Sequence, residues 1–261
     1  MFMWAPFGLS LSLLRTLVFL LLPYNLSIPI GAFSGLLATC SLPINDTTSA
    51  AFSGTHHLYV CNHRTLLDPI YISAALNKLV TAVTYSLSPL SELLAPIPTV
   101  RLTRNKEVDR KKMEEFLKQG DLVVCPEGTT CREPYLLRFS PLFAELTQEV
   151  VPVALDTRVS MFYGTTASGF KWLDPFCFLM NPNPKYELKF LDKIPTGLGG
   201  GSCSYEVANE VQREIGLTLG FECTSLTRKH KYLMLAGNEG TVENRKPKEK
   251  EKVRKKELFR N

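Results

Sequence analysis

The sequence lacks the cysteine patterns that mark structural zinc sites and disulfide-rich domains. Its seven cysteines are an odd number at irregular spacings, with no C-x-x-C pair and no Cys/His cluster at zinc-ligand spacing. This pattern favours reduced thiols facing a reducing compartment. We therefore expect no structural disulfides, no metal and no bound cofactor.

Charge is almost absent from the first 45 residues, where Arg15 is the only charged side chain. The stretch is long enough to cross a bilayer, which takes about 20 apolar residues. Proline, asparagine and glycine interrupt it, however, at Pro23, Asn25, Pro29, Gly31 and Gly35. We predict a hydrophobic membrane-associated segment over residues 1–45, built as a hairpin, a re-entrant element or an interfacial helix. The alternative is a secretory signal peptide, although its basic region would be poor.

The net charge of +5 is concentrated at the carboxyl end. Residues 245–261 contain nine Lys/Arg and three Asp/Glu, so the rest of the chain carries a net charge of −1. Such a run is typical of a disordered tail, and it can also contact anionic lipid head groups. No motif in the body supports nucleic-acid binding, which we do not expect. We predict a domain over residues 46–240 and a basic tail over 241–261.

Strand-like and helix-like runs alternate through the predicted domain. The strand-like runs lie at 57–61, 80–86, 121–125, 150–155 and 185–192, and the helix-like runs at 66–77, 106–119, 140–148 and 203–218. Alternation of this kind predicts an α/β fold with a largely parallel central sheet flanked by helices.

The most informative motif, Asn62-His63-Arg64-Thr65-Leu66-Leu67-Asp68-Pro69, follows the first of these strands. On one helix, His63 and Asp68 would point about 140° apart, so they meet only where a loop enters a helix. Pro69 suits a first helical turn. A neutral imidazole oriented by a carboxylate can take a proton from a hydroxyl group.

Three more blocks follow in order, at residues 97–104, 126–129 and 150–153. Together with the His-Asp block, they resemble the glycerolipid acyltransferase superfamily. The third block and its continuation, residues 123–140, resemble the glycerol-3-phosphate acyltransferases of land plants. The resemblance covers roughly residues 56–235.

The resemblance implies transfer of a fatty acyl group from acyl-CoA to a hydroxyl of glycerol 3-phosphate, with His63 as general base and Asp68 orienting it. It implies that Arg104 binds the phosphate, with Arg101 as second choice. It also places Glu127, Gly128 and Thr129 at the substrate, Glu127 either binding the free hydroxyl or holding Arg104. Pro152 would shape the acyl or thioester pocket.

Two features of these blocks leave other interpretations open. The family commonly has an arginine where this chain has Thr130, so Arg132 or Arg138 would have to supply that charge. Cys61 and Cys125 lie beside the motifs and make a nucleophilic cysteine an alternative, although buried cysteine usually behaves as a small hydrophobe.

The plant relatives carry an upstream phosphatase-like domain that this sequence does not supply, so we expect the product, lysophosphatidic acid, to keep its phosphate. The resemblance implies the endoplasmic reticulum membrane, an active site facing the cytosol, and precursors of cutin, suberin or storage lipid. The expected partners are acyl-CoA, glycerol 3-phosphate and membrane lipid. Acylation of a lysophospholipid, and a catalytically silent membrane scaffold, are the alternatives.

Overall fold

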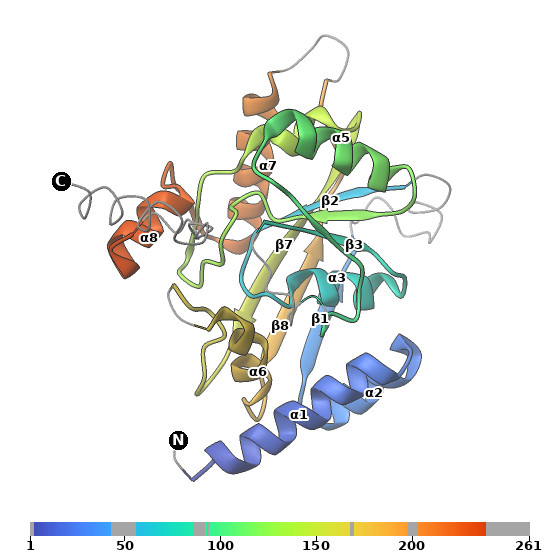
Figure 1. Cartoon of the computed structure of the whole chain (residues 1–261), viewed down its shortest axis with the longest axis vertical. Coiled ribbons are helices and arrows are strands. Elements are labelled where there is room, and N and C mark those ends of the chain that lie inside the picture. Colours follow the sequence, from blue (N-terminus) through green and yellow to red (C-terminus); the bar gives the residue numbers. More distant parts are fainter. Residues whose placement is uncertain are drawn as a thin grey trace, which may run out of the picture.

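A seven-strand path forms the centre of the computed structural model, which describes residues 3–42, 56–85, 92, 94–167, 170–197 and 203–238 (Figure 1). The strand order is β1-β8-β7-β2-β5-β3-β4, and β9 pairs with β7 beside this path. The bounds are β1 Leu37–Ser41, β8 Lys185–Phe190, β7 Glu149–Arg158, β2 Leu58–Cys61, β5 Leu122–Val124, β3 Thr81–Thr84, β4 Thr99–Arg101 and β9 Ile194–Pro195. All pairings are parallel except those of β7 with β8 and β9. The predicted α/β fold with a largely parallel sheet is confirmed.

Helices cover both faces of this sheet. Val60 and Leu122 point into a core that includes Val211 and Ile215 of α7 (Ser204–Leu219). Tyr59 points into the opposite core, which contains residues of α3 (Asp68–Leu76) and α6 (Asp174–Leu179).

The other helices are α5 (Lys106–Leu117), α8 (Arg228–Ala236) and the 3-10 helices η2 (Pro141–Glu145) and η3 (Lys171–Leu173). The predicted helix at 140–148 is therefore a short 3-10 turn. A second small sheet pairs β6 (Tyr135–Leu136) with β10 (Glu222–Cys223).

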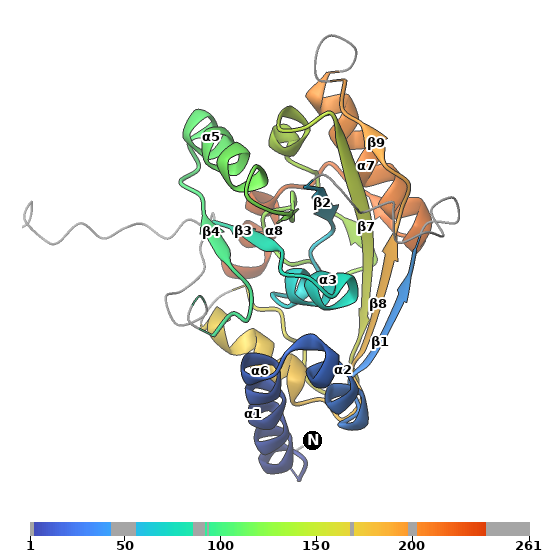
Figure 2. The same cartoon turned by 90° about the vertical axis from the view of Figure 1, so that its right-hand side faces the viewer.

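The charge-poor amino terminus forms α1 (Ala5–Leu21) and α2 (Tyr24–Phe33), which are separated at Pro23. Helix α1 lies against α6 at one end of the sheet (Figure 2). Within the described ranges, no helix combines the length and the apolarity that crossing a membrane requires. Residues 37–41, which we predicted as part of the membrane segment, instead form β1 and pair with β8.

Arg15, the only charge of this region, is buried and fastens α1 to the domain. Its guanidinium donates to the carbonyl oxygens of Leu179, Asn181 and Pro182. It also donates to the hydroxyl and carbonyl oxygens of Ser34, which follows α2. One side chain therefore joins both amino-terminal helices to the segment between α6 and β8.

The parallel topology positions the candidate site. His63 follows the carboxyl end of β2, and Cys125 follows the carboxyl end of the neighbouring strand β5. Ligands of open α/β sheets bind outside the carboxyl ends of the strands, where loops from several strands converge. The two sequence blocks around His63 and Glu127 therefore meet at one edge of the sheet.

Candidate active site

His63 and Asp68 form the dyad that the sequence predicts. The chain turns between β2 and α3, and Nδ1 of His63 lies 2.8 Å from Oδ2 of Asp68. Asp68 is the first residue of α3, where the positive end of the helix dipole favours a carboxylate. Because an ionised carboxylate only accepts hydrogen bonds, Nδ1 donates its proton to Asp68, and Nε2 is the ring nitrogen that can give up or take a proton.

Asp68 is fully buried, and its neighbours satisfy it completely. The backbone N–H of Arg64 donates to Oδ2, and the N–H and hydroxyl of Thr65 donate to Oδ1. The hydroxyl of Tyr186 on β8 also donates to Oδ1. Burial and the charge of Asp68 raise the pKa of Tyr186, so this hydroxyl keeps its proton. The carboxylate is therefore fixed in place and orients the imidazole.

Glu127 holds the backbone of His63. It is 4% exposed, and Oε1 accepts the backbone N–H of His63 at 2.7 Å. Its other oxygen, Oε2, accepts the backbone N–H of Leu137 at 3.0 Å. Burial raises the pKa of Glu127 to about 7, opposed by these two N–H donors. This carboxylate ties the loop after β2 to the segment after β6.

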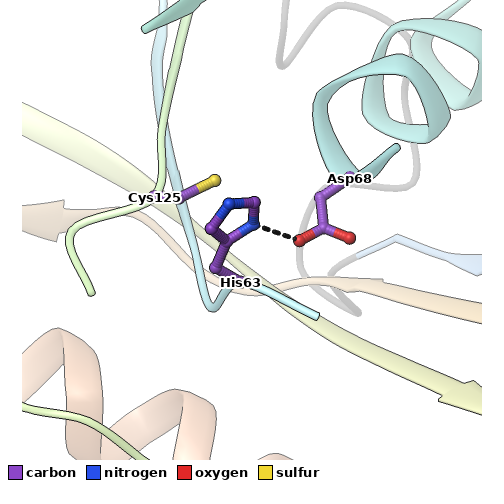
Figure 3. A group of neighbouring side chains, drawn as sticks. All are labelled: His63, Asp68 and Cys125. Carbon is purple, nitrogen blue, oxygen red and sulfur yellow. Dashed lines mark hydrogen bonds and ion pairs between the residues drawn. The ribbon is translucent and has the colours of Figure 1, made fainter. Parts of the chain in front are cut away.

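Cys125 lies on the opposite side of the imidazole from Asp68. In Figure 3, Nε2 of His63 faces the Cys125 sulfur, while Nδ1 faces Asp68. The Cys125 sulfur also lies 3.5 Å from the Cys61 sulfur. A hydrogen bond from Cys61 lowers the pKa of Cys125 to about 6, burial opposes this, and the charge of His63 lowers it further. Burial lowers the pKa of His63, but Cys125 and Asp68 raise it well above its ordinary value.

A basic cavity of about 470 Å³ opens beside Glu127 and Gly128. Four basic side chains from three different segments line it: Arg104, Lys106, Arg138 and Arg228. Of these, Lys106 pairs with Glu145 at 2.8 Å. Burial and the nearby charge of Arg104 lower the pKa of Arg228. Mutual repulsion among these cations favours an anionic ligand.

Arg104 is held in an unusual backbone conformation. Its φ of 69° lies in the left-handed region, which costs a non-glycine residue about 1–3 kcal/mol. The buried carboxylate of Asp109 offsets this by accepting the backbone N–H of Arg104 and two donors of Thr103. Such strain clusters at functional sites. Gly128 also has a positive φ, of 67°, which glycine adopts without strain.

The structure separates the arginines that sequence reasoning left as alternatives. Arg101 is half-exposed on β4 and pairs with Glu92 at 2.8 Å, away from the cavity lining. Arg138 lines the cavity. Arg132 instead lies over the Tyr163 ring and pairs with the neighbouring Glu133.

Thr129 and Pro152 contact other parts of the protein and do not line the basic cavity. Thr129 is buried, and its hydroxyl accepts a hydrogen bond from Lys231 at 3.2 Å. Pro152 lies in the middle of β7, in register with Val60 of β2. It does not belong to the lining of the basic cavity.

Helix α8 contributes residues that sequence reasoning missed. Arg228 lines the cavity, and Lys231 donates to Thr129 and to the carbonyl oxygen of Thr130. The helix therefore packs directly onto the Pro126–Thr130 block. Three basic residues within positions 228–231 are the only sequence signal, and such a run usually marks a solvated helix face.

Comparisons with known proteins find acyltransferases similar to this chain. The profile of the family described as Acyltransferase matches residues 44–158, which include the dyad, Arg104 and Glu127. Glycerol-3-phosphate acyltransferase 1 of Arabidopsis thaliana is 55% identical over 93% of this chain and 42% of its own length. Probable glycerol-3-phosphate acyltransferase 2 of the same plant is 57% identical, over 93% of this chain and 47% of its own length. This chain is therefore similar to plant glycerol-3-phosphate acyltransferases over nearly its whole length and contains a region that matches the Acyltransferase family.

The chain spans about half the length of the curated relatives it matches. Glycerol-3-phosphate acyltransferase RAM2 of Petunia hybrida shows the same proportion, with 52% identity over 92% of this chain and half of its own length. Among solved structures, the 1-acyl-sn-glycerophosphate acyltransferase PlsC of Thermotoga maritima aligns with a TM-score of 0.48 at 14% identity, covering 81% of this chain and 86% of its own.

Proposed function

We propose that this acyltransferase chain moves a fatty acyl group from acyl-CoA to a hydroxyl of glycerol 3-phosphate and so forms lysophosphatidic acid. The observation that carries the proposal is the His63–Asp68 dyad joined, through Glu127, to a cavity lined by Arg104, Arg138 and Arg228. The plant relatives named above support the same acceptor.

His63 acts as the general base. Its Nε2 takes the proton of the acceptor hydroxyl as the oxygen attacks the thioester carbonyl carbon. Asp68 keeps the proton on Nδ1 and stabilises the imidazolium that forms. The carbon–sulfur bond of the tetrahedral intermediate then breaks, and the CoA sulfur leaves with the proton that His63 returns. No bound cofactor takes part in this sequence of steps.

The basic cavity receives the phosphate. A volume of about 470 Å³ lies within the range of about 300–1,000 Å³ that is usual for small-molecule sites. Arginine suits this role because its planar guanidinium donates two parallel hydrogen bonds to a phosphate. Glu127 lines the cavity, and its hydrogen bond with the backbone N–H of His63 connects the phosphate site to the base.

Membrane attachment fits the surface of the amino-terminal helices. Large apolar side chains are exposed along α1 and α2: Phe7, Leu9, Leu13, Leu14, Leu17, Leu21, Leu26, Ile28, Ile30 and Phe33. An exposed apolar surface of this kind is typical of a helix that lies in the membrane interface. We place the protein on the endoplasmic reticulum with the site facing the cytosol, where acyl-CoA and glycerol 3-phosphate meet.

Acyl transfer from acyl-CoA to labelled glycerol 3-phosphate, by membranes that contain the chain, tests this proposal. His63→Ala should reduce the rate by about 10²–10⁴, the usual contribution of a general base. The exposed His56 provides the control, because His56→Ala should leave the rate unchanged. Equal rates for the parent and His63→Ala would refute the base assignment. Transfer to lysophosphatidic acid but not to glycerol 3-phosphate would refute the acceptor, and release of free phosphate would refute the product.

A further inference from the structure

Cys125 completes a series of three side chains that runs from a carboxylate through an imidazole to a thiol. Nδ1 of His63 lies 2.8 Å from Asp68, and the other side of the ring faces the Cys125 sulfur (Figure 3). One atom from each of the three side chains lies within 4.8 Å of the other two. A hydrogen bond joins the His63 and Cys125 side chains. Enzymes that transfer acyl groups through a cysteine use this order of groups, in which the histidine activates the sulfur.

We propose that Cys125 is a site of S-acylation, and that it takes the acyl group from acyl-CoA as a thioester when no acceptor hydroxyl is bound. The donor class rests on the proposed function, whereas the reactivity of the sulfur rests on its neighbours. The Cys125 thiolate attacks the carbonyl carbon of acyl-CoA, the carbon–sulfur bond to CoA breaks, and the CoA sulfur leaves with the proton of the His63 imidazolium. One thioester and one thiol are consumed and one of each is formed, so free CoA reverses the reaction.

The structure separates the two cysteines that the sequence left as alternatives. Cys61 is fully buried, whereas Cys125 is partly exposed. The two sulfur atoms lie 3.5 Å apart, and their hydrogen bond raises the pKa of Cys61 well above its ordinary value. Cys61 therefore keeps its proton and donates it toward the Cys125 sulfur. The same hydrogen bond lowers the pKa of Cys125 to about 6, although burial opposes it. Cys125 is therefore the thiolate of the two at neutral pH.

Cys125 also lies beside the basic cavity. It lines a small apolar pocket that shares Tyr85, Pro126, Ser140 and Leu142 with the wall of that cavity. The thiol and the acceptor hydroxyl use the same imidazole nitrogen, so a thioester carbonyl that is placed for one nucleophile lies near the other. The two nucleophiles compete, and the sulfur reacts when the acceptor is absent. While the acyl group remains on Cys125, it occupies the place of the acceptor hydroxyl.

Site-resolved acylation of the unmodified full chain at pH 6 tests the proposal. The chain is incubated with palmitoyl-CoA and without glycerol 3-phosphate, and the hydroxylamine-sensitive acylation of each cysteine is followed by mass spectrometry. The exposed Cys40 and Cys223, whose pKa burial raises, are the internal references.

The expected rate follows from the pKa of Cys125. At pH 6 about half of this side chain is thiolate, against about 0.3% of a thiol with the ordinary pKa of about 8.5. The lower nucleophilicity of the more acidic thiolate offsets about tenfold of this advantage. We therefore expect Cys125 to be acylated at least about tenfold faster than Cys40 or Cys223, and added CoA to reverse this. Acylation of Cys125 no faster than that of the two references would overturn the proposal.

His63→Ala tests whether the imidazole activates the sulfur. Loss of the cation and of its hydrogen bond should slow acylation of Cys125 about tenfold, whereas His56→Ala, at an exposed position, should leave it unchanged. Circular dichroism and the unaltered acylation of Cys40 show that the variant is folded. Equal acylation of Cys125 in His63→Ala and in the parent would refute the role of the triad.

Transfer to glycerol 3-phosphate, measured in the same preparations, separates the two proposals. A chain that acylates glycerol 3-phosphate but never Cys125 refutes S-acylation alone. A chain that acylates Cys125 but not glycerol 3-phosphate supports S-acylation and refutes the proposed function.

Discussion

Replacement of Glu127 by glutamine distinguishes two roles for this residue. Both carboxylate oxygens accept backbone N–H groups, at 2.7 Å from His63 and 3.0 Å from Leu137, and the side chain is 4% exposed. Glutamine can accept only one of them, since its NH2 group faces the other as a second donor. A buried N–H without an acceptor costs about 1–3 kcal/mol, and loss of charge from the remaining bond brings the total to about 2–4 kcal/mol.

The loop that bears His63 should shift to relieve this conflict. A displacement of about 1 Å at a catalytic group can cost about 10² in rate. We therefore expect Glu127→Gln to lower kcat about 100-fold while leaving KM for glycerol 3-phosphate nearly unchanged. Steady-state acyl transfer and denaturant unfolding measure the two effects. The exposed Glu133 offers the matched control, Glu133→Gln. A large rise in KM with kcat retained would refute our reasoning and assign Glu127 to the acceptor.

Three further variants probe the cavity, the base and the amino-terminal helices. Arg104→Gln should raise KM for glycerol 3-phosphate about 10–100-fold, since a hydrogen bond to a charged group contributes about 1.5–3 kcal/mol; an effect no larger than that of Arg132→Gln would contradict this. Cys125→Ser replaces a thiolate by a neutral hydroxyl, which lowers the pKa of His63. The acidic limb of kcat/KM against pH should move to lower pH, and an unmoved limb would exclude the coupling. Arg15→Met leaves buried carbonyl oxygens without donors and should cost about 1–3 kcal/mol or more in unfolding free energy; a loss below about 1 kcal/mol would show that water replaces the guanidinium.

The central strands and helices were predictable because they alternate along the chain and because burial of one or both faces leaves a recognisable run of apolar residues. The strand-like runs at 57–61 and 121–125 became β2 and β5, with every residue of both strands buried. The first strand, β1, was not predictable. It lies at the edge of the sheet, and all five of its residues are exposed, so it has neither a buried run nor an alternating pattern. Its lack of charge made it indistinguishable from the preceding helices.

The candidate site likewise contains parts that the sequence predicts and parts that it does not. The turn that joins His63 to Asp68 follows from their spacing and from Pro69, because both are local. The role of Glu127 does not, since its partners are two backbone N–H groups and any residue type supplies those. The positions of Arg228 and Lys231 depend on how α8 packs across the Pro126–Thr130 block. That packing is set by long-range contacts and leaves no periodic pattern in the sequence.

The raised pKa of His63 at first opposes a role as general base, because a base must be unprotonated before the hydroxyl arrives. Cys125 removes this conflict. Cys125 raises the pKa of His63 and His63 lowers the pKa of Cys125, so a proton between the two side chains can rest on the nitrogen or on the sulfur without any change in net charge. When the proton lies on sulfur, Nε2 has a free lone pair and the neutral thiol can turn away from it. Binding of an acceptor hydroxyl at Nε2 favours that arrangement, since the hydroxyl needs a proton acceptor and an imidazolium offers none. In the proposed mechanism, the acceptor hydroxyl therefore favours the form of this pair in which the proton lies on sulfur and His63 is the base.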